Sequence, residues 1–580
     1  MRTYMIIPTY WCGPEGNWEE GDAVFDHPTP LNEDGTLKRA LDSLQILNNN
    51  KYTLIILAAA TNTKHETQMK KKVKSIIREA QIPVDTILFT NSDLSRLTKK
   101  LLNEKHIPDI LRMKDYTSIR NMCLFLPYIL DADIAILIDD DEIFEDPEFI
   151  DKAREFIGKK FYGNTIDGVA GYYLNEDNEY YDKVNIQPWM TYWDRFGGKR
   201  EAFDKIIGSE PRLKKTPFAF GGAMVIHRNL MRIVPFDPRI TRGEDTDYVI
   251  NARIFGFNFY LDNVLAIKHL PPPKKHPVWK SFREDIFRFL YDKSKFDTQI
   301  PQTNLLEIKP EDFDPYPGQF MKPDLGDKIF KTNIILALNY LADNKIEDCK
   351  ETIKNIYLAR YDAIPHNNTF QEYLDFQKDW RKLLEHTKTF GNSLKELILE
   401  GLIIKYDKYQ IVKKTILKQG GLDENYELEN LDFFKDLTKK EKRRILSISH
   451  FKHLDPGDYV FHMDEINDSI YLVLNGVLEV SRQNNGDETL IVDEINRGEH
   501  FNETSIFVST PRNVSVQAKT HSDLMIMNKD DLLLIIKENC ELSTKIMWLI
   551  ARKLGDRLSR TTIQFSYSKE QDSDVSDILY

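Results

Sequence analysis

The sequence predicts an α/β fold with a mostly parallel, Rossmann-like sheet, followed by helices and a smaller β-rich domain. Apolar runs that suit buried strands alternate with helical segments in residues 1–140, which is typical of parallel sheets. Residues 328–419 carry long helical periodicity, and residues 430–560 combine short strands with glycine turns. A chain of 580 residues is too long for one hydrophobic core, so we expect several domains.

The composition is that of an ordinary soluble globular protein, with 41% hydrophobic and 29% charged residues. The formal net charge of −12 argues against a sequence-independent nucleic-acid binder, because such binding depends on Lys and Arg that neutralise phosphates. The 4 cysteines lie too far apart for zinc or redox spacing, so we expect reduced thiols. The sequence shows neither a signal-peptide pattern nor an apolar run of membrane-spanning length, so we expect a cytoplasmic protein without a transmembrane segment.

The first part of the chain supplies the elements of the parallel sheet in order. The expected strands lie at 3–9, 52–60, 86–90 and 134–138. The expected helices lie at 37–47, 70–80 and 115–130.

Four consecutive acids, residues 139–142, directly follow the last of these strands. Ligands in open α/β sheets gather beyond the carboxyl ends of such strands, so we expect the chemistry here. Adjacent carboxylates repel one another and need a cation, which commonly also holds phosphate oxygens. If the chain stays extended, Asp139 and Asp141 face the same way and Asp140 points away. A solvated acidic turn is the alternative.

Several motifs follow one another in an order that is typical of one enzyme family. They are residues 6–10, 118–121, 138–141, 220–224 and 242–247, followed by His269. This ordered set resembles the motifs of GT-A fold glycosyltransferases, especially family 2, over residues 1–290. The resemblance implies a GT-A catalytic domain with an Asp-X-Asp motif and a glycosyltransferase of the hexosyltransferase class (EC 2.4). It also implies a nucleotide-sugar donor and a hydroxyl acceptor, either a saccharide or a small molecule.

The same resemblance implies roles for individual residues. A divalent metal, Mn²⁺ or Mg²⁺, would join the donor diphosphate to Asp139 or Asp141 and to His269, and would stabilise the leaving group. Asp245 would take the acceptor's proton in an inverting reaction, with Glu244 as the alternative base. The donor-binding residues would be Pro8, Thr9, Tyr10, Arg120 and Asp140. The acceptor-binding residues would be Trp189, Trp193, Gly221 and Gly222.

Other interpretations of these residues stay open. Glu244 and Asp245 also suit the first turn of a helix, whose dipole stabilises acids, and His269 also suits a core position. A retaining transferase of the same fold, or an inactive nucleotide-responsive scaffold, would carry the same motifs. The second strand ends without the acid that reads the nucleotide base in family 2. Asn62 or Asn91 would supply a polar contact instead, or serve as turn residues.

An aromatic stretch and a basic cluster lie between the acidic run and the glycine motif. Trp189, Tyr192 and Trp193 offer faces that stack on sugars, or they pack under a loop. The basic residues would meet an anionic acceptor or remain solvated. They are Arg195, Lys199, Arg200, Arg212, Lys214 and Lys215.

The last part of the chain carries a second ordered set of motifs. A helix at 433–446 precedes the turn 455–458, the strand-turn-strand stretch 471–480, residues 501–503 and residues 510–514, and a closing helix covers 542–558. This set is similar to cyclic nucleotide-binding domains, which implies a β-roll with flanking helices and cAMP or cGMP as effector. The implied binding residues are Phe501, Asn502, Glu503, Arg512 and Asn513.

In that family the Glu takes the ribose hydroxyl and the Arg pairs with the cyclic phosphate, which suits the fork of a guanidinium. Those roles map to Glu503 and Arg512. Asn502 stands where the family has a glycine, and Asn513 stands where it has Ala, Thr or Ser. An internal salt bridge between Glu503 and Arg512, in a domain that no longer binds ligand, is the alternative.

These observations divide the chain into four expected segments. They are a GT-A domain at 1–295, an all-α linker domain at 296–428, a cyclic nucleotide-binding-like domain at 429–562 and a polar tail at 563–580. The helical or the C-terminal domain would also pair two chains into a homodimer. We therefore predict a metal-dependent glycosyltransferase that a cyclic nucleotide regulates.

Overall fold

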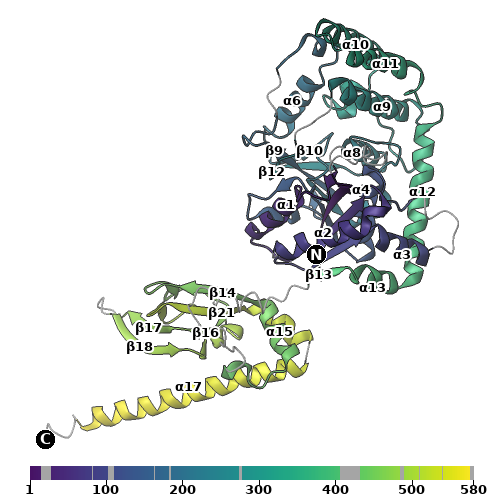
Figure 1. The fold of residues 1–580 in the computed structure, drawn as a ribbon. Helices are drawn as coiled ribbons and strands as arrows, with labels where there is room; N and C mark the ends of the chain where they lie inside the picture. The colour runs from purple at the N-terminus through teal and green to yellow at the C-terminus, as the bar shows by residue number, and fades with distance from the viewer. Residues whose placement is uncertain are drawn as a thin grey trace. The chain divides into compact units, whose positions relative to one another are not determined.

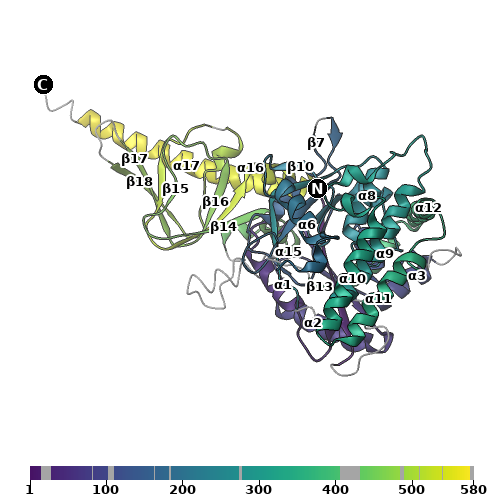
Figure 2. The same cartoon turned by 90° about the horizontal axis from the view of Figure 1, so that it is seen from above.

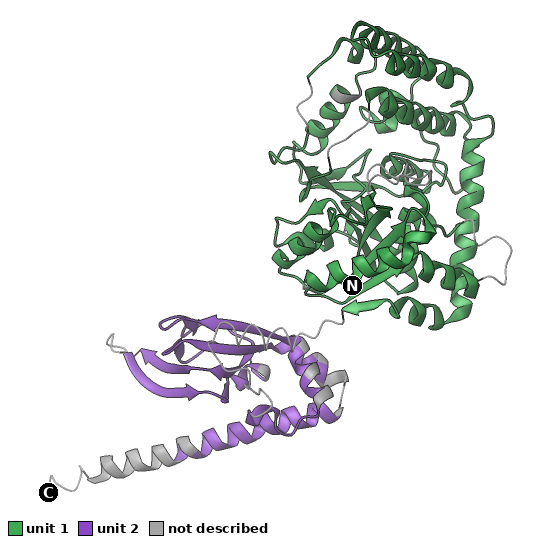
Figure 3. Cartoon of the chain, viewed as in Figure 1, with its two compact units in different colours: residues 1–406 green, residues 407–580 purple. Residues whose placement is uncertain are grey.

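The chain forms two compact units in the computed structural model, residues 1–406 and residues 407–580 (Figure 3). The structure describes residues 1–14, 28–80, 82–101, 110–161, 163–181, 185–272, 277–404, 431–483, 489–508, 510–538 and 540–574. The division into four segments stays a prediction, because the compact units have a single boundary. No helix among the described residues is long and apolar enough to cross a membrane.

The first unit is built on a mixed sheet whose central strands are parallel (Figure 1). Strand β1 (Thr3–Cys12) lies between β5 (Ile134–Leu137) and β3 (Thr53–Ala60), and β4 (Thr86–Thr90) follows β3. All three pairings are parallel, so the carboxyl ends of these strands meet at one edge of the sheet. The predicted parallel α/β core is confirmed.

The other half of this sheet runs in both directions. Strand β11 (Met224–His227) is antiparallel to β5 and to β9 (Gly168–Leu174), and β12 (Phe259–His269) is parallel to β9. The remaining strands of the sheet are β2 (Thr29–Pro30), β6 (Glu142–Ile143), β10 (Leu213–Lys215) and β13 (Leu402–Ile404). Strands β7 (Lys160–Phe161) and β8 (Asn164–Thr165) form a separate pair.

Helices cover both faces of the sheet and bury two clusters of apolar side chains. The most buried of them is α4 (Tyr116–Ile129), in which every residue from 117 to 129 is buried. Asp115 begins this helix by accepting a hydrogen bond from the backbone N–H of Ser118 over 2.8 Å. The other helices are α1 (Leu37–Ser43), α2 (Glu66–Glu79), α3 (Asn91–Leu101), α5 (Phe149–Glu155), α6 (Arg195–Ile206), α7 (Arg228–Ile233) and α8 (Glu244–Ile254).

The later helices share the core of the first unit rather than forming a separate all-α body. They are α9 (Val278–Asp297), α10 (Leu325–Ala342), α11 (Ile346–Tyr361), α12 (Thr369–Thr387) and α13 (Ser393–Leu399). Helix α12 runs along the side of the unit between α11 and α13 (Figure 1), and it lies next to α9 (Figure 2). Its fully buried Trp380 donates its indole N–H to the carbonyl of Met231 over 3.0 Å. The expected linker domain therefore packs as part of the first unit.

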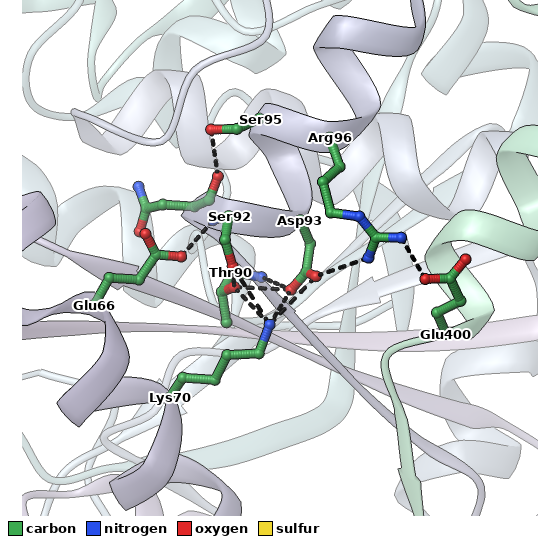
Figure 4. A network of polar contacts seen from close by, with 9 residues as sticks. Glu66, Lys70, Thr90, Ser92, Asp93, Ser95, Arg96 and Glu400 are labelled. Atoms are coloured by element: carbon green, nitrogen blue, oxygen red, sulfur yellow. Dashed lines mark hydrogen bonds and ion pairs between the residues drawn. The ribbon is translucent and has the colours of Figure 1, made fainter.

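A polar network fastens the end of this helical segment to the edge of the parallel sheet (Figure 4). Lys70 of α2 lies 3.0 Å from Asp93 of α3, and the Thr90 hydroxyl at the end of β4 donates to the same carboxylate over 2.7 Å. Arg96 of α3 pairs with Glu400, just beyond α13. Strand β13 then joins the sheet antiparallel to β4.

The second unit is a β-roll of two four-stranded sheets with flanking helices, as predicted. One sheet contains β14 (Ser449–Leu454), β21 (Ser522–Asn528), β16 (Ser469–Asn475) and β19 (His500–Phe501). The other contains β15 (Tyr459–Phe461), β20 (Ser515–Ala518), β17 (Val477–Gln483) and β18 (Thr489–Asn496). The helices are α15 (Lys439–Ile448), α16 (Lys529–Glu538) and α17 (Cys540–Asp574), so α17 extends into the expected polar tail.

Candidate functional site

A cleft of about 970 Å³ opens in the first unit beyond the carboxyl ends of β1 and β5. Among the predicted site residues, the cleft lining includes Pro8, Tyr10, Arg120, Asp139, Asp140, Asp141, Gly221, Glu244, Asp245 and His269. These residues come from different elements and meet because the strand ends meet. The sequence therefore located this cleft.

The three aspartates of the acidic run turn toward three different partners. Strand β5 ends at Leu137 and a turn follows, so the chain does not stay extended as expected. Asp139 faces Arg120, and Asp141 Oδ2 lies 3.3 Å from His269 Nε2. Asp140 accepts a hydrogen bond of 2.6 Å from the hydroxyl of Thr9, which is fully buried. Asp139 and Asp141 thus do not face one ion together.

Arg120 neutralises Asp139 through two parallel contacts. Its Nη1 lies 2.8 Å from Asp139 Oδ1 and its Nη2 donates to Oδ2 over 2.9 Å, while its Nε donates to Glu244 over 3.3 Å. Burial lowers the pKa of this guanidinium, but the two carboxylates more than offset burial and hold it well above the usual range. Burial raises the pKa of Glu244 against the opposing effect of Arg120. Asp139 and Glu244 therefore serve first as partners of a buried cation.

Asp141 and His269 form the pair that best suits a metal. Strands β6 and β12 pair His269 with Glu142 in register, and the ring of Tyr173 stacks on His269 with centroids 4.5 Å apart. Burial and the two neighbouring aspartates, Asp139 and Asp141, raise the pKa of Glu142 well above its usual value. With Asp139 occupied by Arg120, the predicted three-residue metal set reduces to two side chains.

The two glycines of the 220–224 motif are needed for packing. A Cβ on Gly222 would lie 1.9 Å from Glu142 Oε1, and a Cβ on Gly221 would lie 2.5 Å from Arg120 Nη2. Gly221 also donates its backbone N–H to Asp245 over 3.2 Å. Their first role is to let the buried carboxylate and guanidinium approach the backbone.

Asp245 stands at the first turn of α8 and also faces the cleft. Its carboxylate accepts the backbone N–H of Thr246 over 2.7 Å as well as that of Gly221. Gly243, with φ of 72°, precedes the helix in the left-handed conformation that glycine adopts readily. Both interpretations of Asp245, helix-terminal acid and site residue, are compatible with this position.

The predicted aromatic wall belongs to the core. Trp189 is 6% exposed and Trp193 is 1% exposed, and both rings pack on Phe282 of α9. They contribute nothing to the cleft lining, whereas Tyr192 is exposed. The prediction that Trp189 and Trp193 contact a ligand is corrected, because apolar contacts with α9 account for their burial.

The two asparagines considered as nucleotide contacts have backbone roles. Asn62 accepts the N–H of Lys64 and caps a short 3₁₀ helix. Asn91 accepts the N–H of Ala60 over 3.0 Å and so joins α3 to β3. Both are therefore turn and cap residues.

The cleft also includes residues that sequence reasoning missed or only grouped loosely. Tyr180 and Tyr181 line the cleft, and the Arg200 guanidinium lies 4.5 Å from the centre of the Tyr181 ring. Among the members of the basic cluster whose side chains the structure describes, Lys199 and Arg200 line the cleft, and Arg242 lines it from outside that cluster. Arg212 instead pairs with Glu155 and Asp262. In the sequence, the two consecutive tyrosines shortly before the basic cluster were the pattern that could have indicated these residues.

The second candidate site lies in the β-roll around residues 501–513. Phe501 is buried and its ring stacks on Tyr471, with centroids 5.0 Å apart. Asn502 follows with φ of 67° and ψ of 26°. This is the left-handed region, which glycine adopts freely and asparagine tolerates better than most residues. Asn502 thus keeps the backbone conformation that suits the family's glycine and adds a side chain at this position.

The Asn502 side chain accepts a hydrogen bond from the guanidinium of Arg512. Arg512 Nη1 donates to Asn502 Oδ1 over 2.7 Å and Nη2 donates to the carbonyl of Asn467 over 2.9 Å. The Asn502 amide donates in turn to the carbonyl of Ser469 over 2.7 Å. Arg512 is 7% exposed and its Nε has no hydrogen-bond partner. A buried guanidinium with unused donors is suited to an anion. Asn513 is exposed.

Glu503 does not pair with Arg512 and contacts His500 and Arg557 instead. Its Oε1 lies 2.7 Å from His500 Nδ1, and its Oε2 accepts from Arg557 of α17 over 3.0 Å. Burial raises the pKa of this carboxyl, but His500 and Arg557 more than offset that effect and lower it. The alternative of an internal Glu503–Arg512 salt bridge is therefore wrong.

The fold and this site define a class of domain. A family profile described as "Cyclic nucleotide-binding domain" matches residues 451–539. The second unit thus contains a cyclic nucleotide-binding domain, which confirms the prediction for this part of the chain. A solved cyclic nucleotide-binding domain from Methylobacillus flagellatus is 18% identical and covers 27% of this chain and 83% of that chain, with a TM-score of 0.23.

Two curated proteins are also similar to part of this chain. The cAMP-dependent protein kinase regulatory subunit of Yarrowia lipolytica is 27% identical over 103 residues, which is 18% of this chain and 27% of the relative. "Lysophospholipase nte1" of Neosartorya fischeri is 24% identical over 172 residues, which is 28% of this chain and 11% of the relative. The chain thus spans about a tenth of that relative's length.

The prediction of a glycosyltransferase is contradicted by these comparisons. Several curated relatives are named lysophospholipases, which are hydrolases and not sugar transferases. The hexosyltransferase class, the GT-A assignment and the sugar donor and acceptor are withdrawn with it. The described residues that line the cleft include several tyrosines but no serine, threonine or cysteine.

Proposed function

We propose that this protein binds a cyclic nucleotide in its second unit and responds to it. Arg512 carries the proposal, because its guanidinium is buried, has an Nε without a hydrogen-bond partner and, among the described residues, donates to neutral oxygens of Asn502 and Asn467. A cyclic phosphate would replace the Asn502 oxygen and provide a charge-assisted contact, which is roughly twice as strong as a neutral hydrogen bond.

Glu503 supports the same proposal within residues 501–513, the segment that forms the cyclic nucleotide cassette. A ribose hydroxyl would donate to Glu503 and compete there with Arg557, which is 38% exposed at its side chain and therefore replaceable by solvent. Loss of the Arg557 contact would loosen α17 from the β-roll. A ligand shifts such an equilibrium only by its differential affinity for the two states.

The test is thermal unfolding of the full chain with cAMP, with cGMP and with AMP as the non-cyclic control. A ligand that binds only the native state raises the unfolding temperature, and a concentration of 100 times Kd contributes about 2.7 kcal/mol. We expect a shift with at least one cyclic nucleotide and none with AMP. Equal curves at millimolar concentrations of both cyclic nucleotides would contradict the proposal.

For the first unit we infer a cleft that binds a phosphorylated ligand through a divalent cation. Asp141 and His269, 3.3 Å apart, are the side chains that would hold the ion, and Mg²⁺ or Mn²⁺ suits the carboxylate. Such an ion would neutralise phosphate oxygens. Lys199, Arg200 and Arg242 line the same cleft and would add positive charge.

The measurement for this cleft is Mn²⁺ binding by electron paramagnetic resonance, with and without inorganic pyrophosphate as the phosphorylated probe. We expect pyrophosphate to tighten Mn²⁺ binding to the full chain, beyond the effect of pyrophosphate in solution, and Asp141→Asn to abolish this effect. His227 and Asp167, an Asp–His pair 3.0 Å apart outside the cleft, provide the matched control variant Asp167→Asn. The same enhancement in Asp141→Asn as in the unsubstituted chain would overturn the inference.

A further inference from the structure

The second unit carries a cluster of metal-ligating side chains at the far end of its β16 strand from the cassette. The cassette side chain of Asn502 contacts Ser469 at the start of β16, whereas Asp523, beside the cluster, pairs with Asn475 at its end. In the part of the chain that the structure describes, His453, Asp455 and His521 are the group of three whose ligand atoms all lie within 4.8 Å of one another.

The register of two paired strands brings these residues together. Strands β14 and β21 are antiparallel, with His453 opposite Asp523 and Leu454 opposite Ser522. Asp455 directly follows β14 and His521 directly precedes β21, so both residues lie where the pairing of the two strands ends. The cluster therefore combines His453 near the end of β14 with the residue that follows β14 and the residue that precedes β21.

The distances between the ligand atoms are close to those of a metal site. Asp455 Oδ1 lies 3.0 Å from His521 Nδ1 and 3.7 Å from His453 Nε2. Two ligands that each lie about 2.1 Å from a tetrahedral zinc ion are about 3.4 Å apart. The two imidazole rings lie nearly parallel, 12° apart, with centroids separated by 6.1 Å. Small side-chain rotations would complete the geometry.

A buried carboxylate orients the first histidine. Asp523 Oδ1 lies 2.8 Å from His453 Nδ1, and the Asp523 side chain is 8% exposed with its Oδ2 lacking a hydrogen-bond partner. In a neutral ring this contact keeps the proton on Nδ1, which leaves Nε2, the nitrogen 3.7 Å from Asp455 Oδ1, as the one that would bind a metal. A carboxylate–histidine–metal relay of this kind is the usual support of a metal-bound imidazole.

We propose that His453, Asp455 and His521 bind a divalent transition-metal ion, with Zn²⁺ the best match to two imidazoles and one carboxylate. The three ligands leave a fourth position for water. The ion would cross-link the turn after β14 to the turn before β21 and stabilise the β-roll. The site is separate from the cyclic nucleotide cassette, so it stands or falls independently of the proposed function.

The experiment is Zn²⁺ titration by calorimetry of the full chain, without a polyhistidine tag and after removal of metals by a chelator. We expect His521→Ala and Asp455→Asn each to lose one equivalent of bound Zn²⁺, and Asp523→Asn to weaken binding by about 10- to 100-fold. His462→Ala removes an exposed histidine of the same unit outside the cluster and should retain full binding. Asp141→Asn, in the other unit, should also retain the one equivalent of Zn²⁺ that is bound by His453, Asp455 and His521.

Cobalt supplies a second readout that a salt bridge alone would not produce. Co²⁺ in the full chain should show the visible absorption of a tetrahedral site, and His521→Ala should lose it while its circular dichroism stays unchanged. Equal Zn²⁺ stoichiometry and affinity in the unsubstituted chain and in His521→Ala, or no Zn²⁺ binding by the unsubstituted chain, would overturn the proposal.

Discussion

The side-chain oxygen of Asn502 lies 2.7 Å from Nη1 of Arg512 and accepts its hydrogen bond. A neutral amide thus stands where the cyclic nucleotide-binding family offers its arginine to a phosphate. The backbone of Asn502 keeps the left-handed conformation of the glycine that it replaces, so the difference is confined to the side chain. The Asn502 side chain therefore controls how readily a phosphate can reach the Arg512 guanidinium.

The substitution Asn502→Gly should therefore increase the affinity for cyclic nucleotide. Glycine retains the positive φ without strain and removes the competing oxygen from Arg512. We expect Kd to fall by about tenfold, which corresponds to about 1.4 kcal/mol. Calorimetry with cAMP and cGMP measures this change, and Asn496→Gly, at an exposed asparagine outside residues 501–513, should leave Kd unchanged. An equal or higher Kd in Asn502→Gly would contradict the role assigned to its side chain.

Glu503 should give the second unit a defined acid sensitivity. Its pKa is lowered in the folded chain, so its ionised form contributes stability above the unfolded pKa of about 4.3. That contribution is lost as the pH falls from about 4.3 through the lower folded pKa. Glu503→Gln should be less stable than the unsubstituted chain at pH 7, and this deficit should shrink only below about pH 4.3. Urea unfolding of both chains from pH 7 to pH 3.5 tests this, and a deficit independent of pH would be inconsistent with it.

Trp193 should behave as a core residue and not as a ligand contact. It is 1% exposed and packs against Phe282 and Phe289. Trp193→Ala should lower the free energy of unfolding by about 3–5 kcal/mol. Tyr192→Ala, at a neighbouring side chain that is 47% exposed, serves as the control and should stay within about 0.5 kcal/mol. Full stability of Trp193→Ala would return this residue to the list of candidate ligand contacts.

Gly222 should tolerate no side chain, because a Cβ would collide with Glu142 at 1.9 Å. Gly222→Ala should destabilise the first unit by about 1–3 kcal/mol, the usual cost of overpacking. Gly326 in α10 has no atom within 4 Å of the same added carbon, so Gly326→Ala should instead stabilise it by about 0.4–1 kcal/mol. Chemical unfolding of both variants compares the two, and similar effects would refute the packing role of Gly222.

Patterns of buried strands and helices predicted most of the fold. Strand β4 has the bounds expected from its apolar run, and Asp115 begins α4 where the helical pattern begins. The mixed half of the sheet was harder to predict because short strands such as β10 and β13 carry little periodicity. The join of α12 to the first unit depends on Trp380 and Met231, which are 149 residues apart in the sequence.

The sequence also located the first cleft but not the direction of each side chain. Strand β5 stops at Leu137, and the turn that follows sends Asp139 to Arg120 and Asp141 to His269. The sequence could not show this, since the partner residues come from other strands and helices. Arg557 on α17 was missed for the same reason, because it meets Glu503 from 54 residues away.

The most direct test of the central claim is calorimetric titration of the full chain and of Arg512→Gln with cAMP and cGMP. Loss of a charge-assisted hydrogen bond costs about 1.5–3 kcal/mol, so Kd should rise by at least tenfold in Arg512→Gln. Arg482→Gln, at an exposed arginine of the same β-roll, should leave Kd unchanged. Equal affinity of the unsubstituted chain and Arg512→Gln, or no binding of either nucleotide by the unsubstituted chain, would contradict the assignment of Arg512 as the phosphate ligand.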